Sequence, residues 1–269
     1  MFTKKINFVV TAFNEESRII SVLNSIQPFA SKIIVLDAGS TDNTVSIIHS
    51  HSSDVIVKLV ENPYNFKSRI NSAREFISDD NDWVMVISCS EFLPSSLGFL
   101  LLDKINSSKK LVGVDFYRQS YTFGVPTHSK KFHYLITMFC RTKNYRLFRL
   151  SFWNSTHSRM HVESPVNLPS SRTVLSLLPK KQFSLIHTRS GSLNDIESKH
   201  SLYSSREAIE MLSNTKKPSL LKGLFVFLIV FLYFLPTIFY NKKAFIAGFY
   251  HAFYKFQVQA KAFLHSQSD

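Results

Sequence analysis

Short apolar runs bounded by turn residues recur along the first half of the chain. Each run contains valine or isoleucine, and polar or acidic side chains follow several of them. Buried strands of a parallel sheet have this pattern. The predicted strands cover residues 6–11, 33–36, 55–59, 83–87 and 111–117.

Apolar residues at helical spacing lie between these runs. They form stripes within residues 19–26, 45–48, 70–77 and 94–107. A stripe of this kind marks the face of a helix that packs on a core. Alternating strands and helices predict an α/β fold with a mostly parallel central sheet flanked by helices.

Asp37 follows the predicted strand 33–36. Ligands of open α/β sheets bind outside the carboxyl ends of the strands, so Asp37 is placed to meet one. Gly39 allows a backbone turn that a residue with a Cβ atom resists. Ser40, Thr41 and Asp42 are each able to cap the helix that follows. From this stretch alone, Asp37 either accepts hydrogen bonds from a ligand or only stabilises its own turn.

The composition changes from about residue 200. The run 223–240 carries no charge and has lysines on both sides, and residues 211–268 contain no Asp or Glu. Phenylalanines then recur at helical spacing at positions 245, 249, 253 and 256. We interpret 201–269 as a membrane-associating helical region, in which the run 223–240 and the phenylalanine stripe form a helical pair embedded in the cytoplasmic leaflet. A single membrane span and a buried dimer interface are the alternatives.

The chain of 269 residues has a net charge of +13, and 14% of its residues are aromatic. This balance favours anionic partners: nucleotide diphosphates, phosphorylated glycolipids or an anionic membrane. We expect no nucleic-acid partner, because the sequence has no zinc-finger spacing, RNA-binding motif or compact basic arm. Cys89 and Cys140 lie far apart and predict a reducing compartment. Residues 1–7 lead straight into a strand, so we expect no cleavable signal peptide.

Three stretches occur in an order that resembles the inverting glycosyltransferases of family 2, which have the GT-A fold. They are TAFNEE at 11–16, DAGSTDNT at 37–44 and an apolar strand that leads to Glu91. RLFR at 146–149 and the aromatic C-terminal helices are similar to the branch that adds glucose to the inner core of lipopolysaccharide. The resemblance implies a GT-A-like, Rossmann-related domain over residues 1–200, followed by the helical region 201–269.

The resemblance also implies a nucleotide-sugar donor, with uridine diphosphate as its nucleotide. It places the loop 11–15 against the uracil, and a basic residue and an asparagine at the start of the third helical stretch near the nucleotide. The matching residues are Thr11, Ala12, Asn14, Glu15, Asp37, Gly39, Lys67 and Asn71. Glu15 and Glu16 have a plainer interpretation, because acidic side chains stabilise the amino end of a helix.

The family holds Mn²⁺ or Mg²⁺ on the donor diphosphate with an Asp-x-Asp motif followed by Glu. Here Ser88, Cys89 and Ser90 stand in that place, and only Glu91 keeps a charge. Hydroxyl groups are poor ligands for these cations beside carboxylates. Glu91 would therefore hold a metal weakly, and fixed basic side chains are the alternative. We expect Cys89 to be a small buried residue.

Glu163 follows His161 after one intervening residue, where the family pattern has His directly before Glu. The resemblance implies that Glu163 is the general base, since a sugar hydroxyl must lose its proton as the new bond forms. A surface ion pair is the alternative. Arg146 and Arg149 are expected to present guanidinium groups to phosphate. By the same resemblance, His187 closes over the diphosphate.

These inferences predict an inverting glycosyltransferase that moves a sugar to a lipopolysaccharide-core or related envelope glycan, on a glycolipid or oligosaccharide acceptor. The predicted location is the cytoplasmic face of the bacterial inner membrane. The alternative is a degenerate relative that binds nucleotide or glycan without catalysis in an envelope assembly complex. The intact stretch 37–44 favours the enzyme, and loss of the Asp pair favours the binder.

Overall fold

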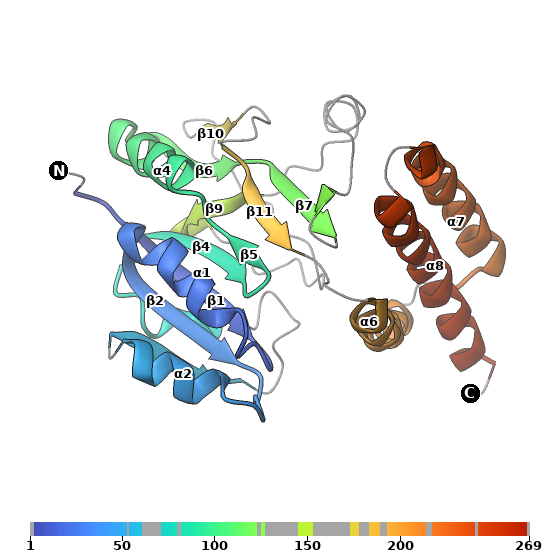
Figure 1. Cartoon of the computed structure of the whole chain (residues 1–269). Coiled ribbons are helices and arrows are strands. Elements are labelled where there is room, and N and C mark those ends of the chain that lie inside the picture. Colours follow the sequence, from blue (N-terminus) through green and yellow to red (C-terminus); the bar gives the residue numbers. More distant parts are fainter. Residues whose placement is uncertain are drawn as a thin grey trace. The chain divides into compact units, whose positions relative to one another are not determined.

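The structure is a computed structural model, and its described residues form two compact units (Figure 1). Unit 1 comprises residues 1–119 and 140–187, and unit 2 comprises residues 120–139 and 188–269. The division that the sequence predicts at residue 200 stays a prediction. The described residues are 3–52, 54–60, 71–79, 82–122, 125–126, 145–152, 173–177, 183–188, 193–213, 217–239 and 242–267.

A seven-stranded sheet forms the centre of unit 1. Its strands are β1 (Ile6–Ala12), β2 (Ala30–Asp37), β3 (Val55–Leu59), β4 (Trp83–Ser88), β6 (Leu111–Asp115), β9 (Tyr145–Arg149) and β10 (Thr173–Ser176). They lie in the order β10-β6-β9-β4-β1-β2-β3. All neighbours are parallel except β9, which is antiparallel to both β4 and β6. The predicted mostly parallel central sheet is confirmed.

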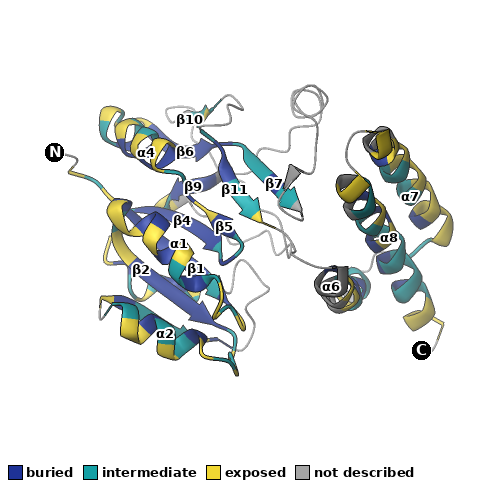
Figure 2. Ribbon diagram, viewed as in Figure 1, coloured by how far each residue is buried: buried dark blue, intermediate teal, exposed yellow. Residues whose placement is uncertain are grey.

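Apolar side chains cover both faces of this sheet, because successive residues of a strand point to opposite faces. Phe8 and Val10 of β1 belong to one core layer, together with buried residues of three helices. Val9 belongs to the other layer, with Ala73 and Ile77. Figure 2 shows the central strands as the most deeply buried part of the unit. The helices of the first layer are α1 (Ile19–Ile26), α2 (Thr44–His51) and α4 (Ser95–Ser107).

A short antiparallel pair follows the end of β4. Strand β5 (Glu91–Phe92) pairs with β11 (Leu185–Thr188), and His187 lies opposite Glu91 in this pair. The pairing brings a residue near the end of unit 1 beside the turn that follows β4. It therefore joins two positions that are 96 residues apart in the sequence.

Unit 2 contains the helices α6 (Leu193–Ser213), α7 (Leu220–Phe234) and α8 (Lys242–His265). Helix α8 packs against both α6 and α7. Gly248 makes part of this packing possible, because a Cβ atom there would lie 2.1 Å from Cγ of Phe234. Tyr250 and Tyr254 donate hydrogen bonds to Glu197 and Glu207 of α6. The described residues include no helix with both the length and the apolar character needed to cross a membrane.

Candidate active site

The carboxyl ends of β1, β2 and β4 lie at one edge of the central sheet, because these strands are parallel and in close register. Ala12 of β1 is opposite Asp37 of β2, and Thr11 is opposite Ser88 of β4. Three polar segments meet at this edge: the first loop at 11–16, the second loop at 37–44 and the turn at 88–91.

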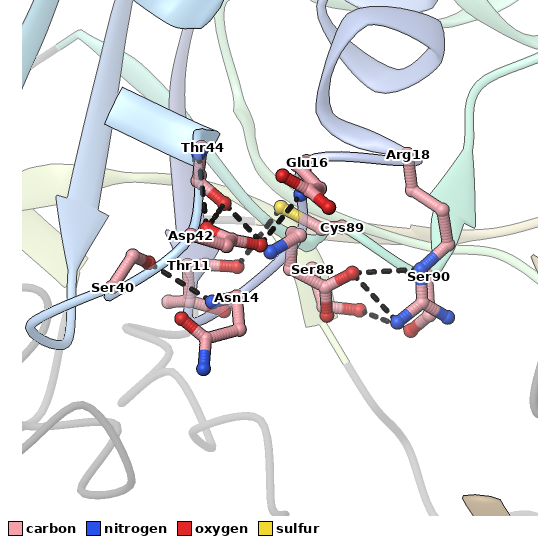
Figure 3. Close-up of polar contacts among 11 residues, drawn as sticks. Thr11, Asn14, Glu16, Arg18, Ser40, Asp42, Thr44, Ser88, Cys89 and Ser90 are labelled. Atoms are coloured by element: carbon pink, nitrogen blue, oxygen red, sulfur yellow. Dashed lines mark hydrogen bonds and ion pairs between the residues drawn. The ribbon is translucent and has the colours of Figure 1, made fainter. Parts of the chain in front are cut away.

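The first and second loops are hydrogen-bonded to each other (Figure 3). The backbone N–H of Asn14 donates to Ser40 Oγ at 2.9 Å, and the side-chain Oδ1 of Asn14 accepts from Thr41 N at 2.8 Å. The N–H of Glu15 donates to Thr44 Oγ1 at 2.7 Å. The two motifs therefore form a single rigid element at the sheet edge.

Glu16 and Asp42 take part in further hydrogen bonds between the first and second loops. The N–H of Glu16 donates to Asp42 Oδ2 at 3.2 Å, and Asn43 N donates to Glu16 Oε2 at 3.1 Å. Slight burial raises the pKa of Asp42, but hydrogen bonds from Thr44 and Glu16 outweigh it and hold the pKa below its ordinary value. Helix α2 begins at Thr44 after Asn43. The N-cap position is Asn43, one residue after the predicted range 40–42. The Asp42 carboxylate nevertheless accepts from Thr44 N, the first amide of the helix, at 3.0 Å.

Asn14 has a backbone φ of +54°, a conformation that few residues other than glycine adopt. Asn14→Ala is expected to lower the free energy of unfolding by about 1–2 kcal/mol, through backbone strain and loss of the bond to Thr41. Asn14→Gly loses the same bond without the strain and should cost less. Urea unfolding of both variants measures the difference. Equal losses would show that the backbone conformation contributes nothing.

Asp37 is 3% exposed, and its carboxylate accepts hydrogen bonds from the turn that directly follows it. Oδ2 accepts from Gly39 N at 3.0 Å and from Ser40 N at 2.9 Å, while Oδ1 accepts from the Ser40 hydroxyl. Gly39 has a φ of +82°, so the predicted need for glycine in this turn is confirmed. A carboxylate has about four acceptor positions. Three are used here, so contact with a ligand stays a prediction.

Glu91 is buried at the same edge and is surrounded by positive charge. Its Oε1 lies 2.6 Å from Arg146 Nη1 and 3.1 Å from Arg118 Nη1, and its Oε2 accepts from Ser88 N at 3.0 Å. Burial alone would raise the pKa of Glu91. Arg146, Arg118 and His187 reverse that effect and lower the pKa to about 2. Glu91 is therefore ionised, and both of its oxygens are engaged.

Arg118 is not among the site residues predicted from the sequence, although it directly follows the predicted strand 111–117. Its side chain is 37% exposed, whereas that of Arg146 is 10% exposed. Arg118 is therefore the guanidinium of this cluster that a ligand reaches most easily. We name Glu91, Arg118, Arg146 and His187 the Glu91 cluster, and all four residues belong to unit 1.

Arg149 lies away from this edge. It is opposite Trp83, the first residue of β4, and its guanidinium lies over the Trp83 ring at 5.3 Å from the centroid. Its Nε donates to the carbonyl oxygen of Leu111, the first residue of β6. These contacts are at the amino ends of the parallel strands. We therefore assign Arg149 no role toward the diphosphate.

The residues in place of the family's metal motif do not fit a divalent cation. The hydroxyl groups of Ser88 and Ser90 are hydrogen-bonded to each other at 2.9 Å, and Glu91 is paired with arginine. Cys89 is buried, as predicted, and burial raises the pKa of its thiol, which donates to Thr11 O at 3.3 Å. Among the residues that the structure describes, no group of three His, Cys, Asp or Glu side chains is placed to hold a metal.

The structure describes only some of the remaining predicted site residues. Glu15 forms an ion pair with Arg18 at 2.6 Å. Asn71 is exposed in a helical segment at 71–74, and no contact with another described residue places it at the sheet edge. The predictions for Lys67, His161 and Glu163 fall outside the described residues.

Comparison with known proteins identifies the family. Residues 8–176 match the model of glycosyl transferase family 2. An uncharacterized glycosyltransferase of Rickettsia bellii is 36% identical over 97 residues, which are 36% of this chain and 31% of that protein. The chain spans about a third of the length of the curated relatives that it matches.

Two solved structures resemble parts of the chain. The Staphylococcus aureus protein TarS, solved with UDP-GlcNAc, is 16% identical with a TM-score of 0.47, over 77% of this chain and 66% of that one. Glucosyl-3-phosphoglycerate synthase of Mycobacterium tuberculosis, solved with Mn²⁺ and UDP, is 26% identical with a TM-score of 0.33, over 45% and 44%. These ligands belong to those proteins.

The family match covers more than half of the chain. The chain therefore belongs to glycosyl transferase family 2, and the predicted GT-A-like fold with its mostly parallel sheet is confirmed. The finer assignment to the lipopolysaccharide inner-core branch stays a prediction.

Proposed function

We propose that the protein is an inverting glycosyltransferase that takes its sugar from a uridine diphosphate donor. The observation that carries this proposal is the arrangement at one sheet edge. There the two hydrogen-bonded loops lie beside the Glu91 cluster, whose arginines supply fixed positive charge around a buried carboxylate. Family membership supports the transfer of a sugar. The loops would hold the nucleotide, and the cluster would face its diphosphate.

The proposed reaction is a single displacement. A hydroxyl oxygen of the acceptor attacks the anomeric carbon while the bond from that carbon to the diphosphate oxygen breaks. The electron pair of the broken bond leaves on the diphosphate. The proton of the hydroxyl passes to a carboxylate, for which Glu163 is our candidate from the sequence.

Charge on the departing diphosphate must be stabilised, and this is usually the largest catalytic contribution. The described residues at this edge provide guanidinium groups in place of the metal ligands of the family. Arg118 is the more exposed of the two and would contact the diphosphate, while Arg146 holds Glu91. Glu91 would act as a positioning residue that keeps both arginines at the edge.

We propose a phosphorylated envelope glycan as acceptor, of the lipopolysaccharide-core type, at the cytoplasmic face of the bacterial inner membrane. The net charge of +13 supports an anionic acceptor, because a basic surface raises the local concentration of anionic ligands. The similarity of RLFR at 146–149 to the inner-core branch supports the glycan class.

The proposal is tested by incubating the purified full chain with UDP-sugars and acceptor glycans and measuring both UDP release and product mass. Release with a heavier acceptor supports it. Binding of UDP without turnover would instead support the non-catalytic alternative, which the engagement of Ser88, Ser90 and Glu91 favours.

Asp37→Ala is expected to weaken the binding of UDP by about 1.5–3 kcal/mol, the value of a hydrogen bond to a charged group. Ser40→Ala is the control, because it removes the hydroxyl that donates to Asp37 and accepts from Asn14 N, and it leaves the carboxylate in place. Ser88→Ala and Ser90→Ala should have smaller effects. Calorimetric titration with UDP measures all four variants. Unchanged affinity in Asp37→Ala would show that Asp37 serves only its turn.

A further inference from the structure

Helix α7 is apolar on two opposite sides, and α8 covers only one of them. Phe227 and Phe231 of α7 each lie 6.2 Å, between ring centroids, from Phe249 of α8. Gly223 allows α7 and α8 to approach each other closely on this side, because a Cβ atom there would lie 2.9 Å from Cβ of Gln259. A helix that is apolar around its whole circumference is normally buried on all sides.

The other side of α7 is exposed (Figure 2). We name it the outer α7 face, and its residues are Leu221, Leu224, Phe225, Leu228, Ile229 and Leu232. Leu221 is 81% exposed and Phe225 is 64% exposed. Contiguous apolar surface of this kind marks a site of interaction with a protein or a membrane.

Lysines lie at both ends of this face. The exposed ones are Lys217, Lys222, Lys242 and Lys243. Two further lysines of α8 are used inside unit 2 instead: Lys255 Nζ lies 3.7 Å from Glu207, and Lys261 Nζ donates to Ser201 O at 2.9 Å. Residues 211–268 contain no Asp or Glu. Within residues 211–268 the charged side chains are therefore all basic.

We propose that the outer α7 face lies in the surface of an anionic lipid bilayer, with the helix axis parallel to the membrane. The apolar side chains would enter the boundary between headgroups and acyl chains. The lysines would contact anionic headgroups. Lysines at both ends of the outer α7 face favour this orientation. When the helix axis is parallel to the membrane, both ends lie at the depth of the headgroups.

A second copy of the chain fits this face less well. Two outer α7 faces packed together would bring the lysines at their ends close to one another, and residues 211–268 supply no acidic partner for them. The same positive charge is complementary to a bilayer that contains phosphatidylglycerol. The proposal concerns unit 2 and does not depend on the proposed reaction.

Vesicle flotation of the full-length protein tests the proposal. The protein should float with phosphatidylcholine vesicles that contain phosphatidylglycerol. The combined variant Leu221→Glu, Phe225→Glu, Leu232→Glu should lower the partition coefficient more than about tenfold, since burial of one large apolar side chain corresponds to about that factor. Ile209→Glu, at an exposed position of α6, is the matched control and should float like the unmodified protein.

A second variant tests the charge separately. Replacing Lys217, Lys222, Lys242 and Lys243 by glutamine should remove the preference for phosphatidylglycerol and the sensitivity of binding to salt. Circular dichroism and urea unfolding of each variant verify that it is folded. Absence of flotation, or equal flotation of the triple glutamate variant, would overturn the proposal. A dimer that only the triple variant dissociates, with no vesicle binding, would assign this face to a second copy.

Discussion

Sugar transfer by the protein is expected to continue in excess chelator, whereas Arg118→Ala is expected to lower kcat about 100-fold. The magnitude is that of removing one group that stabilises developing charge in a transition state. Arg118 is the exposed guanidinium of the Glu91 cluster, and Glu91 itself is paired with arginine. Neutralisation of the diphosphate should therefore depend on fixed charge.

Two further variants make this experiment specific. Arg118→Lys keeps the charge and loses the planar fork of the guanidinium, so its kcat should be intermediate. Arg149→Lys is the matched control, because Arg149 lies at the amino ends of the strands. A strong requirement for Mn²⁺ or Mg²⁺ would contradict the arginine mechanism. Nucleotide binding without turnover under every condition would favour the non-catalytic alternative.

Loss of the Glu91 carboxylate is expected to destabilise unit 1 strongly. Glu91→Gln leaves Arg118 and Arg146 close together without their anion, and breaking a buried ion pair typically costs about 3–5 kcal/mol. Glu75→Gln is the matched control: its ion pair with Lys58 is exposed, so its loss should cost less than about 1 kcal/mol. Chemical unfolding at neutral pH measures both variants.

The same carboxylate predicts a dependence of stability on pH. The pKa of Glu91 is about 2 in the folded protein and 4.5 as its ordinary value. A lowered folded pKa means that the stabilisation is present above the ordinary value and is lost as the pH falls toward 2. The difference corresponds to about 3 kcal/mol. Unfolding curves of Glu91→Gln should lack this component, and parallel pH profiles for the two proteins would contradict it.

Several features of unit 1 follow from the sequence alone. Apolar runs predict the strands, and the polar residues that follow β1, β2 and β4 predict that polar segments meet at one edge of the sheet. This succeeds because strand formation and burial are encoded locally, and because parallel strands must end at the same edge. The positive φ of Gly39 is likewise a local requirement of its turn.

The roles of individual polar side chains were decided by long-range contacts. Between the first and second loops, Asn14 is hydrogen-bonded to Ser40 and Thr41, and Glu16 is hydrogen-bonded to Asp42 and Asn43. Their residue types suit either a ligand or a partner loop. Only the register that places β1 beside β2 shows that the loops bond together.

The positions of the basic side chains were also decided by long-range contacts. Arg146 and Arg149 are three residues apart on one strand, so they point to opposite faces and lie near opposite ends of it. Their spacing does not reveal the direction of β9. The antiparallel pairing with β4 decides that Arg146 reaches Glu91 and Arg149 does not.

In unit 2, too, the sequence predicts the helices, and the packing of the helices decides which side chains are exposed. The sequence by itself determined two apolar, lysine-flanked helices at the end of the chain, because helical periodicity is a local property. Which side of α7 is covered depends on how α8 packs on it, and that packing leaves Leu221 and Phe225 exposed. Composition and spacing thus determined the elements and their chemistry. Strand direction and helix packing join distant residues, so only the tertiary structure decided which side chains meet.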